Sequence, residues 1–269
     1  MNVQIKDDFD LHKIMNSGQC FRVTCENDTY RFIHGKHILY IRHKEGIHYE
    51  ISCSRYAWNH IWKPYFDLSV SYKELGYRIP SSDSYLQEAY TFSRGIRILH
   101  QDPFEMVITF IISQRKSIPA IRSAVEKLSQ AAGTPIDEEK TIYAFPTISE
   151  LSRLSTDELK ACSLGYRAPY IYETVRKLKK MPHLLKDMED MDDTELLAAL
   201  MDLPGVGIKV ASCAALFGFH RKSMAPVDVW IDRVIQQKYN GKNPFPQWGE
   251  DSGIIQQYLF YYAQQTHMK

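Results

Sequence analysis

The chain has 269 residues, of which 44% are hydrophobic and 24% are charged. This composition is typical of a folded protein with a sizeable core, and it excludes an intrinsically disordered chain. The 33 Lys and Arg residues nearly balance the 32 Asp and Glu residues, so the formal net charge is only +1. A polycation that coats nucleic acid is therefore excluded, whereas a local basic surface is not.

Cellular location and metal content are also bounded by the sequence. It contains no run of the roughly 18 apolar residues that a membrane-spanning helix needs, and its first residues lack the apolar core of a signal peptide. We therefore expect a cytoplasmic protein, associated with the nucleoid if the source is prokaryotic. Five cysteines are present, without a CxxC pair or a zinc-like spacing. We expect no metal centre, no iron–sulfur cluster and no structural disulfide.

Three short runs near the N-terminus, residues 29–33, 37–42 and 47–52, alternate apolar and polar side chains. Gly35 and Gly46 lie between these runs and are typical of tight turns. The runs predict an antiparallel meander with one buried face, followed by a helix at residues 83–95. The side chains assigned to the buried face are Tyr30, Phe32, Ile38, Tyr40, Ile47, Tyr49 and Ile51.

The pattern changes to helices from Gln101 onward. Pro103 opens the first helix, because proline is favoured at the first helical position, and apolar residues follow it at helical spacing. We therefore expect an α+β fold, with an antiparallel sheet domain at residues 1–98 and a mostly helical domain at residues 99–269. Further helices are predicted at residues 118–128, 168–178, 193–200, 208–217, 227–239 and 252–265.

The most informative stretch is Leu-Pro-Gly-Val-Gly-Ile-Lys-Val-Ala at residues 203–211, between two predicted helices. Gly205 and Gly207 permit a tight turn and a close approach of the backbone to a partner. The helix that follows would expose the N–H groups of its first turn, and its dipole favours an anion there. A phosphate of a DNA backbone fits this geometry. An ordinary turn between two helices is the alternative.

Lys209 and Asp228 are the candidate catalytic residues. Lys209 falls in the first turn of its predicted helix, where the positive end of the helix dipole disfavours an ammonium. A lysine amine in its neutral form is a nucleophile. Asp228 belongs to Pro-Val-Asp-Val-Trp at residues 226–230 and opens another predicted helix. Asp228 would cap that helix or act as the carboxylate partner of Lys209, which could itself be an ordinary surface lysine.

These two motifs resemble the helix-hairpin-helix superfamily of base-excision DNA glycosylases, and within it the 8-oxoguanine DNA glycosylases. Three more segments carry the resemblance: Ser-Gly-Gln-Cys-Phe-Arg at 17–22, Gln-Asp-Pro-Phe-Glu at 101–105 and Leu-Gly-Tyr-Arg-Ala at 164–168. They occur in the order of the family and spread over most of the chain. The resemblance implies a sheet domain packed against a helical domain. It also implies double-stranded DNA containing oxidised guanine as the partner, and we expect a monomer.

The resemblance implies the chemistry as well. Such enzymes rotate the damaged nucleotide out of the base stack into a pocket. Lys209 would attack C1′ of the deoxyribose, displace the base and form a Schiff base, and β-elimination would then cut the strand. Asp228 would stabilise the positive charge that develops on the sugar. We expect no cofactor, although a monovalent cation could bind the hairpin carbonyl oxygens near Met201, Leu203 and Val206.

Five residues are implied to form the pocket for the extruded base. The carbonyl of Gly18 would accept a hydrogen bond from N7–H of 8-oxoguanine, and guanine has no hydrogen at N7. Cys213 and Phe260 would stack on the two faces of the base. Gln256 would read its Watson–Crick edge, and Pro226 would line the same pocket. A buried cysteine, a core phenylalanine and a surface glutamine are the alternatives for Cys213, Phe260 and Gln256.

Further residues are implied to contact the DNA. Tyr166 resembles the wedge that enters the base stack, and Arg167 its neighbour on the opposite strand. The main departure from the family pattern is at residues 115–117 and at Ala120. Familiar members carry an asparagine run there and, in the eukaryotic ones, an arginine, and these side chains read the opposite cytosine. The other residues assigned to DNA contacts are Arg115, Gly205, Val206, Gly207 and Gln247.

Other functions stay open at this point. Monofunctional glycosylases for alkylated or deaminated bases lack a lysine at the position of Lys209. Endonuclease III and adenine glycosylases usually carry a four-cysteine cluster after the hairpin, where this chain has only Cys213. A non-catalytic helix-hairpin-helix protein that only holds DNA would explain Gly205 and Gly207, but it would not explain the lysine and the aspartate.

Overall fold

The computed structural model describes residues 1–266, which fall into two compact units. The first unit comprises residues 1–31, 39–100 and the segment from His220 onward, and the second comprises residues 32–38 and 101–219. This division differs from continuous domains at 1–98 and 99–269. The reason is that the C-terminal helix α15 (Ser252–Gln265) packs on α5 (Ser84–Ser93), far from it in sequence.

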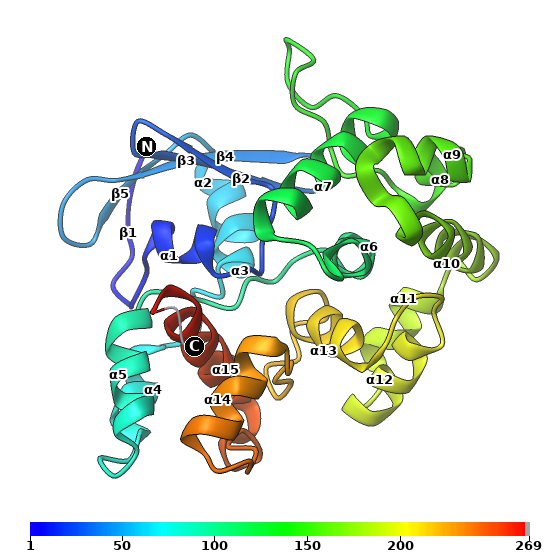
Figure 1. Cartoon of the computed structure of the whole chain (residues 1–269). Helices are drawn as coiled ribbons and strands as arrows, with labels where there is room; N and C mark the ends of the chain where they lie inside the picture. The colour runs from blue at the N-terminus through cyan, green and yellow to red at the C-terminus, as the bar shows by residue number, and fades with distance from the viewer. Residues whose placement is uncertain (267–269) are drawn as a thin grey trace. The chain divides into compact units, whose positions relative to one another are not determined.

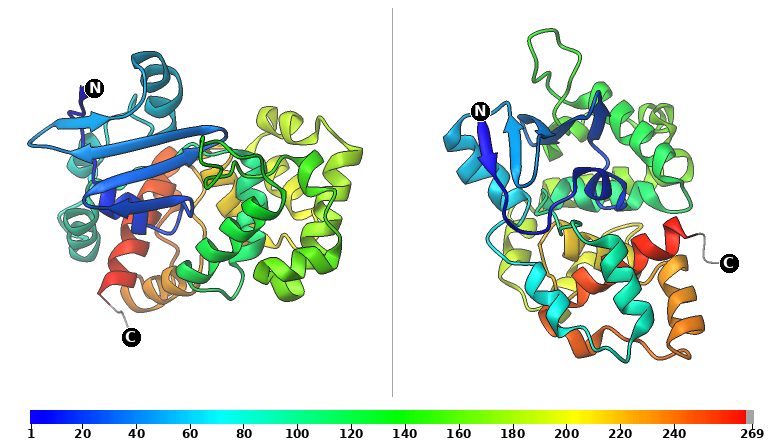
Figure 2. Two further views of the ribbon diagram at one scale, coloured as in Figure 1. Left: turned by 90° about the horizontal axis from the view of Figure 1, so that it is seen from above. Right: turned by 90° about the vertical axis from the view of Figure 1, so that its left-hand side faces the viewer.

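The N-terminal part of the chain forms a five-stranded sheet in the order β1-β5-β4-β3-β2 (Figures 1 and 2). β4 and β5 pair in antiparallel fashion with Ile41 opposite Ile51, and β1 pairs with β5 in the same way. The predicted antiparallel meander is confirmed, and with it the α+β fold class. The strands are β1 (Asn2–Gln4), β2 (Val23–Glu26), β3 (Thr29–His34), β4 (His37–His43) and β5 (His48–Ile51).

The buried face predicted for the run at 37–42 is wrong. Leu39 and Ile41 are fully buried, whereas Tyr40 is 42% exposed and Ile38 is half-buried. The run carries apolar side chains in both phases of its alternation, so its own pattern does not select a face. The cross-strand partner selects it, because Ile41 lies opposite the buried Ile51. The assignment of Ile47 to the buried face is also wrong, because this residue lies in the turn before β5 and is exposed.

The helices of the first unit are built around α15. It packs on α5 and on α14, and the Ser93 hydroxyl at the end of α5 donates a hydrogen bond to the buried carbonyl of Tyr258 at 3.0 Å. The helices of this unit are α1 (Leu11–Asn16), α2 (Arg55–Ala57), η1 (Trp58–Trp62), α3 (Lys63–Tyr65), α4 (Lys73–Arg78), α5, α14 (Val229–Lys238), η5 (Pro246–Asp251) and α15.

The second unit is built around α6 (Pro103–Ser113). Every side chain of α6 from Phe104 to Ser113 is buried, and α6 contacts α7, α10 and α13. Asp102 caps α6 by accepting the Glu105 N–H at 2.8 Å, directly before the proline that opens it. The other helices of this unit are α7 (Ile118–Ala132), α8 (Ile148–Leu151), α9 (Thr156–Leu159), η2 (Lys160–Leu164), η3 (Gly165–Arg167), α10 (Ala168–Lys180), α11 (Leu184–Asp187), η4 (Met188–Asp190), α12 (Asp193–Met201) and α13 (Ile208–Phe217).

Candidate active site

The hairpin between α12 and α13 is a tight turn that needs glycine at one position. Gly205 has φ of 79°, and a β carbon there would lie 2.5 Å from Cβ of Tyr170 on α10. Gly207 has an extended backbone, and a β carbon on it would meet no atom within 4 Å. Gly207 also provides no side-chain cap for α13, so the N–H groups of the first turn are available to an anion.

The carbonyl groups of the hairpin are held by side chains from other elements of the same unit. The Thr174 hydroxyl of α10 donates to the Pro204 carbonyl at 2.8 Å. The side-chain amide of Gln114, directly after α6, donates to the Gly205 carbonyl at 3.0 Å. Inside the turn, the Val206 N–H donates to the Leu203 carbonyl at 3.1 Å. The backbone of the hairpin is therefore fixed before any partner binds.

Lys209 is the second residue of α13, as its motif predicts, and its side chain is half-buried. Its Nζ atom lies 5.4 Å from the centre of the Phe110 ring of α6. Cys213 lies one helical turn further along α13 and is only 4% exposed. The structure therefore places the predicted nucleophile and the predicted stacking thiol on the same helix, next to the hairpin.

The predicted wedge and its neighbour lie where η2 meets α10, and they differ in exposure. Tyr166 is 52% exposed, whereas Arg167 is buried and its guanidinium carbon lies 4.3 Å from the centre of the Tyr166 ring. Arg167 Nε donates to the main-chain carbonyl of Gln114 at 2.9 Å, and Nη1 donates to the Leu164 carbonyl at 3.4 Å. These hydrogen bonds hold the guanidinium of Arg167 on carbonyl groups of the protein itself. A contact between Arg167 and DNA therefore stays a prediction.

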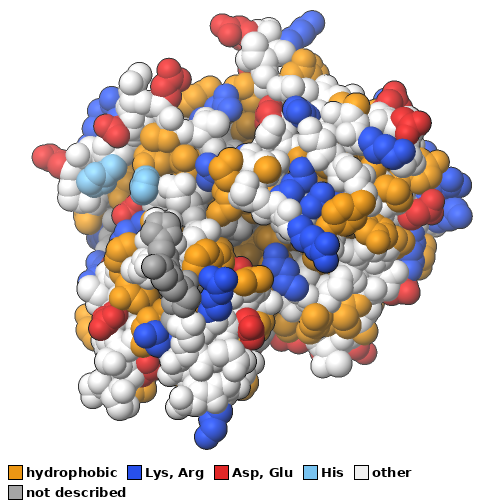
Figure 3. Space-filling view, in the orientation of Figure 1, with side chains coloured by type: hydrophobic (Ala, Val, Ile, Leu, Met, Phe, Trp, Pro, Cys, Tyr) orange, Lys and Arg blue, Asp and Glu red, His pale blue; other side chains and the backbone are white. Residues whose placement is uncertain are grey.

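The loop after α6 carries two cations of the predicted DNA surface. Arg115 is exposed and has φ of 51°, an uncommon conformation for a residue with a side chain. The Lys116 ammonium donates to the Ser163 carbonyl at 2.7 Å. Burial lowers the pKa of Lys116, and the positive charges of Arg167 and Lys127 lower it further. Figure 3 shows Lys and Arg side chains gathered beside hydrophobic ones on the face of this unit between α7 and α13.

In the first unit, Gly18 lies between α1 and β2 with φ of 74°. The buried side chain of Gln19 beside it donates to the Arg97 carbonyl at 2.8 Å and accepts the Leu99 N–H at 2.8 Å. These bonds fix the turn that carries Gly18. No signal in the sequence marks Gln19 separately for this role, beyond its place in the segment at residues 17–22.

The other predicted pocket residues of the first unit lie on and before α14 and on α15. Asp228 caps α14, because its Oδ1 accepts the N–H groups of Trp230 at 3.1 Å and Ile231 at 2.9 Å. The Gln256 amide donates to the Pro226 carbonyl at 3.0 Å, so the structure brings these two predicted residues together. Figure 1 shows α14 beside α15.

Phe260 and Gln247 complete the predicted residues of the first unit. Phe260 is half-buried and follows Gln256 by one turn of α15, as predicted. Gln247 is exposed in η5, and its amide donates to the Pro244 carbonyl at 3.0 Å. It lines a cavity of about 620 Å³ together with Asp83 and Tyr239.

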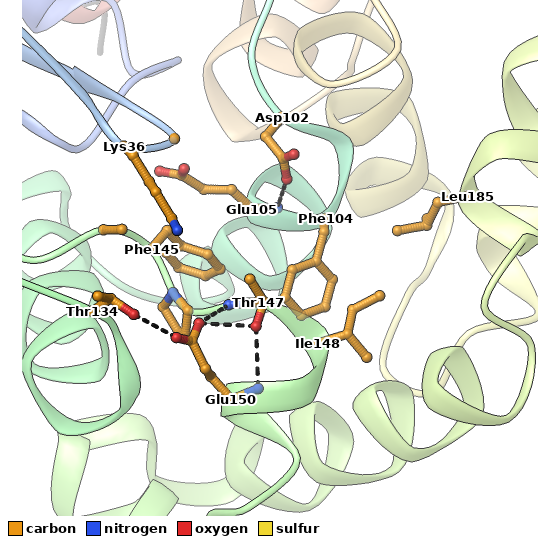
Figure 4. A pocket seen from close by; sticks show the side chains of 13 residues that line it. Lys36, Asp102, Phe104, Glu105, Thr134, Phe145, Thr147, Ile148, Glu150 and Leu185 are labelled. Carbon is orange, nitrogen blue, oxygen red and sulfur yellow. Dashed lines mark hydrogen bonds between the residues drawn. The ribbon is translucent and has the colours of Figure 1, made fainter. Parts of the chain in front are cut away.

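A cavity of about 430 Å³ lies in the second unit, away from the predicted residues (Figure 4). Its apolar wall includes Phe104 and Phe145, and Lys36 reaches it from the tip of the β3–β4 hairpin. Glu150 accepts hydrogen bonds from Thr134 at 2.6 Å and from the Thr147 N–H at 2.8 Å, and these bonds lower its pKa. The carboxylate of Glu150 is therefore used to cap α8, and none of the described lining residues is a predicted site residue.

Comparison with known proteins identifies the family. Residues 2–107 match the family model for the N-terminal domain of 8-oxoguanine DNA glycosylase. Residues 108–247 match the model for the HhH-GPD superfamily of base excision DNA repair proteins. The chain belongs to the 8-oxoguanine DNA glycosylase branch of this superfamily. The resemblance of its motifs is thereby confirmed.

Relatives and solved structures of this family match most of the chain. A probable N-glycosylase/DNA lyase of Methanothermobacter thermautotrophicus is 33% identical over 68% of each chain. The structure of MBOgg1 with a low-affinity DNA ligand is 33% identical, with a TM-score of 0.92 over 99% of this chain and 96% of the other. The Clostridium acetobutylicum 8-oxoguanine glycosylase/lyase, in complex with DNA that has cytosine opposite 8-oxoguanine, is 31% identical. Its TM-score is 0.90 over 100% of this chain and 99% of the other.

Some curated relatives are longer than this chain. It spans 58% of the N-glycosylase/DNA lyase OGG1 of Arabidopsis thaliana and 51% of the N-glycosylase/DNA lyase of Saccharomyces cerevisiae. Within residues 1–266, no helix is both long and apolar enough to cross a membrane.

Proposed function

We propose that this 8-oxoguanine DNA glycosylase family member is a bifunctional glycosylase and AP lyase that excises 8-oxoguanine from duplex DNA. The observation that carries the proposal is the position of Lys209. It is the second residue of the helix after the Leu-Pro-Gly-Val-Gly hairpin, half-buried and in contact with the Phe110 ring. An amine at this place serves a lyase, whereas neither a monofunctional glycosylase nor a passive DNA-binding protein uses it.

The proposed reaction begins at the deoxyribose of the extruded nucleotide. The Lys209 amine forms a bond to C1′ as the glycosidic bond breaks and the base leaves with the electron pair. Opening of the sugar gives a Schiff base between Nζ and C1′. Loss of a proton from C2′ then expels the 3′ phosphate and cuts the strand. Asp228 stabilises the positive charge on the sugar during base release, which is an electrostatic contribution of high value in a site that excludes water.

The proposed base pocket uses Gly18, Cys213, Pro226, Gln256 and Phe260. The turn around Gly18 is fixed by the hydrogen bonds of Gln19. A fixed Gly18 carbonyl can accept a hydrogen bond from N7–H of 8-oxoguanine but would face an unpaired acceptor at N7 of guanine. The Gln256 amide gives one hydrogen bond to Pro226 and accepts one from Gln257 at 3.0 Å. One N–H and one lone pair therefore stay available for the edge of the base.

The proposed DNA contacts begin at the hairpin. The first turn of α13 after Gly207 binds a backbone phosphate, and Gly205 shapes the turn. Val206 contributes through its backbone position, since its N–H is already used within the turn. Tyr166, exposed on its loop, enters the base stack. Further proposed DNA contacts are Arg115, Arg167 and Gln247.

The protein acts in this proposal as a cytoplasmic monomer, nucleoid-associated if prokaryotic, without an organic cofactor. The carbonyl oxygens of Met201, Leu203 and Val206 are the groups that would hold a monovalent cation. The carbonyls of Pro204 and Gly205 accept hydrogen bonds from side chains, and the Leu203 carbonyl accepts the Val206 N–H at 3.1 Å, so a cation would share the Leu203 oxygen with that bond. Such a cation would fix the hairpin and take no part in bond making or breaking.

A strand-cleavage assay on duplexes with one 8-oxoguanine, run with and without borohydride, tests the proposal. Reduction of the Schiff base by borohydride should give a covalent protein–DNA adduct, and the parallel reaction should give the cut strand. Base release without an adduct indicates a monofunctional glycosylase. Binding without base release indicates a passive helix-hairpin-helix protein, and either result overturns the proposal.

A further inference from the structure

Gln114 is the first residue after α6, and it hydrogen-bonds to two different loops of the second unit. Its main-chain carbonyl accepts a hydrogen bond from Arg167 Nε at 2.9 Å and a second one from Arg167 Nη2. Its side-chain amide donates to the Gly205 carbonyl at 3.0 Å and to the Ile111 carbonyl at 3.1 Å. Both N–H groups of the amide are therefore used. A single residue thus joins the loop that carries Tyr166 to the hairpin at 203–207.

The bond to Arg167 reaches the wedge directly. The planar guanidinium lies against the Tyr166 ring, with its carbon 4.3 Å from the ring centre, and its orientation is set by the carbonyl that it grips. The surrounding loop needs such support. Ser163 has φ of 64° and Gly165 has φ of 56°, and a left-handed backbone is costly at a residue with a side chain. The Lys116 ammonium adds a second tie by donating to the Ser163 carbonyl at 2.7 Å.

The bond to Gly205 fixes one peptide plane of the hairpin from both sides. The carbonyl of the peptide between Gly205 and Val206 accepts from Gln114, and the N–H of the same peptide donates to the Leu203 carbonyl at 3.1 Å. Gly207 and the first turn of α13 follow directly, so their direction depends on this plane. Loss of the Gln114 amide would leave the plane held on one side only.

On the basis of the glycosylase function proposed above, we propose that Gln114 is a positioning residue that holds the wedge Tyr166 and the hairpin 203–207 in one fixed arrangement. The hairpin grips a phosphate while the wedge opens the stack, so extrusion of the base requires both at a set separation on the DNA. A misplacement of about 1 Å can cost on the order of 100-fold in rate. Gln114 touches neither base nor sugar in this role.

Gln114→Met tests the proposal, because methionine keeps the length and the apolar stem of the side chain but has no donor. Gln130→Met is the matched control, since Gln130 is exposed on α7 of the same unit. Hydrogen exchange of the free proteins should show faster exchange at residues 203–207 in Gln114→Met only. Fluorescence of a 2-aminopurine placed beside the lesion should show base extrusion slowed by about 10-fold or more. The thermal midpoint should stay close to that of the wild type.

A double variant separates positioning from direct DNA contact. If Gln114 acts through the wedge, Gln114→Met should slow extrusion much less in a Tyr166→Ala background than in the wild type. Unchanged exchange at 203–207 overturns the proposal, and so does a full additive effect in the double variant, which would make Gln114 a DNA contact. If the wild-type protein neither releases the base nor forms an adduct, the proposed glycosylase function is wrong, whatever the role of Gln114. The exchange experiment needs no DNA and would still judge the role of Gln114.

Discussion

The Nζ atom of Lys209 lies 5.4 Å from the centre of the Phe110 ring, which joins the start of α13 to the core of α6. Phe110 is 3% exposed and stacks on Phe217, with the ring centres 5.5 Å apart. The Phe110 ring, against which the Lys209 side chain lies, is therefore itself held in place by Phe217. A lysine side chain loses much rotamer freedom when it is ordered, so an ordered stem in the free protein reduces that cost when DNA binds.

Lys209→Gln should abolish strand cleavage and borohydride trapping while binding of undamaged duplex is largely retained. The reason is that one amine is both the nucleophile and the former of the Schiff base, whereas phosphate contacts dominate DNA affinity. Trapping gels and a binding titration measure the two effects. Lys180→Gln, which removes an exposed lysine from α10, is the control for the lost charge. Retained trapping in Lys209→Gln would show that another amine does the chemistry.

Phe110→Leu should slow borohydride trapping by about 10-fold at saturating DNA, because the stem of Lys209 then has a smaller surface to rest on. DNA affinity should not change. Phe104→Leu provides the comparison, since Phe104 is buried in the same helix and its ring packs on Phe145 instead. Equal slowing in both variants would mean that general loosening of α6, and not the contact with Lys209, causes the effect.

Asp228→Asn should slow base release by about 100-fold or more, which corresponds to about 3 kcal/mol of charge stabilisation. The substitution keeps the group that caps α14. Oδ1 of Asp228 caps α14 through the N–H groups of Trp230 and Ile231, and an asparagine oxygen can accept both bonds. The thermal midpoint should therefore stay nearly constant while single-turnover release slows. A near-normal rate would leave Asp228 as a helix cap only.

Gly207→Leu should weaken binding to damaged and undamaged duplexes by the same factor without a loss of stability. The backbone of Gly207 is extended and a β carbon there meets no atom within 4 Å, so the folded protein has room for a side chain. The same side chain would keep a phosphate away from the N–H groups of the first turn of α13. Gly205→Ala should behave differently and lower the thermal midpoint, because φ is 79° and Tyr170 leaves no room. A Gly207→Leu variant that loses affinity for the lesion alone would place the hairpin in the base pocket.

The longer helices and the strands β3 to β5 could be predicted because their signals are local. The short strands β1 and β2 and the short helices, such as α1 to α4, α8, α9 and α11, were not predicted. Pro103 opens α6 where expected, and α13 and α15 have the predicted limits. α14 begins at Val229 rather than 227, because the Asp228 side chain supplies the cap and its backbone is extended. The face of β4 could not be predicted, since its apolar residues occupy both phases and a distant strand decides between them.

The residues of the candidate site also fall into those with a local sequence signal and those without one. Lys209, the hairpin glycines and Asp228 stand in short motifs, and each lies at the helix start that its motif predicts. Gln114 and Thr174 were missed, because both act on main-chain carbonyls, and a carbonyl carries no residue-specific signal. Gln114 and Gly205 are 91 positions apart, so no periodicity links them.

The surface expected to face the strand opposite the lesion carries few groups that can identify a base. Arg115 and Ser117 are exposed, and Ala120 in α7 offers no hydrogen-bond donor to an opposite cytosine. Two arginines are the candidate substitutes as readers, Arg122, which is half-buried in α7, and Arg167. Arg167 is only 6% exposed, and its guanidinium already donates to the carbonyls of Gln114 and Leu164. To reach a base, Arg167 would have to break the bonds that support the wedge.

We therefore predict that this enzyme excises 8-oxoguanine opposite all four bases with only a shallow preference for cytosine. Each missing bidentate contact removes roughly 1–3 kcal/mol of discrimination, and a lysine or serine cannot present the paired donor and acceptor of an asparagine. Single-turnover excision on the four duplexes measures the preference. Arg167→Met should leave the ratio between cytosine and the other bases unchanged while slowing all four reactions. A cytosine preference above about 100-fold in the wild type, abolished by Arg167→Met, would show that Arg167 leaves its protein partners to read the opposite base.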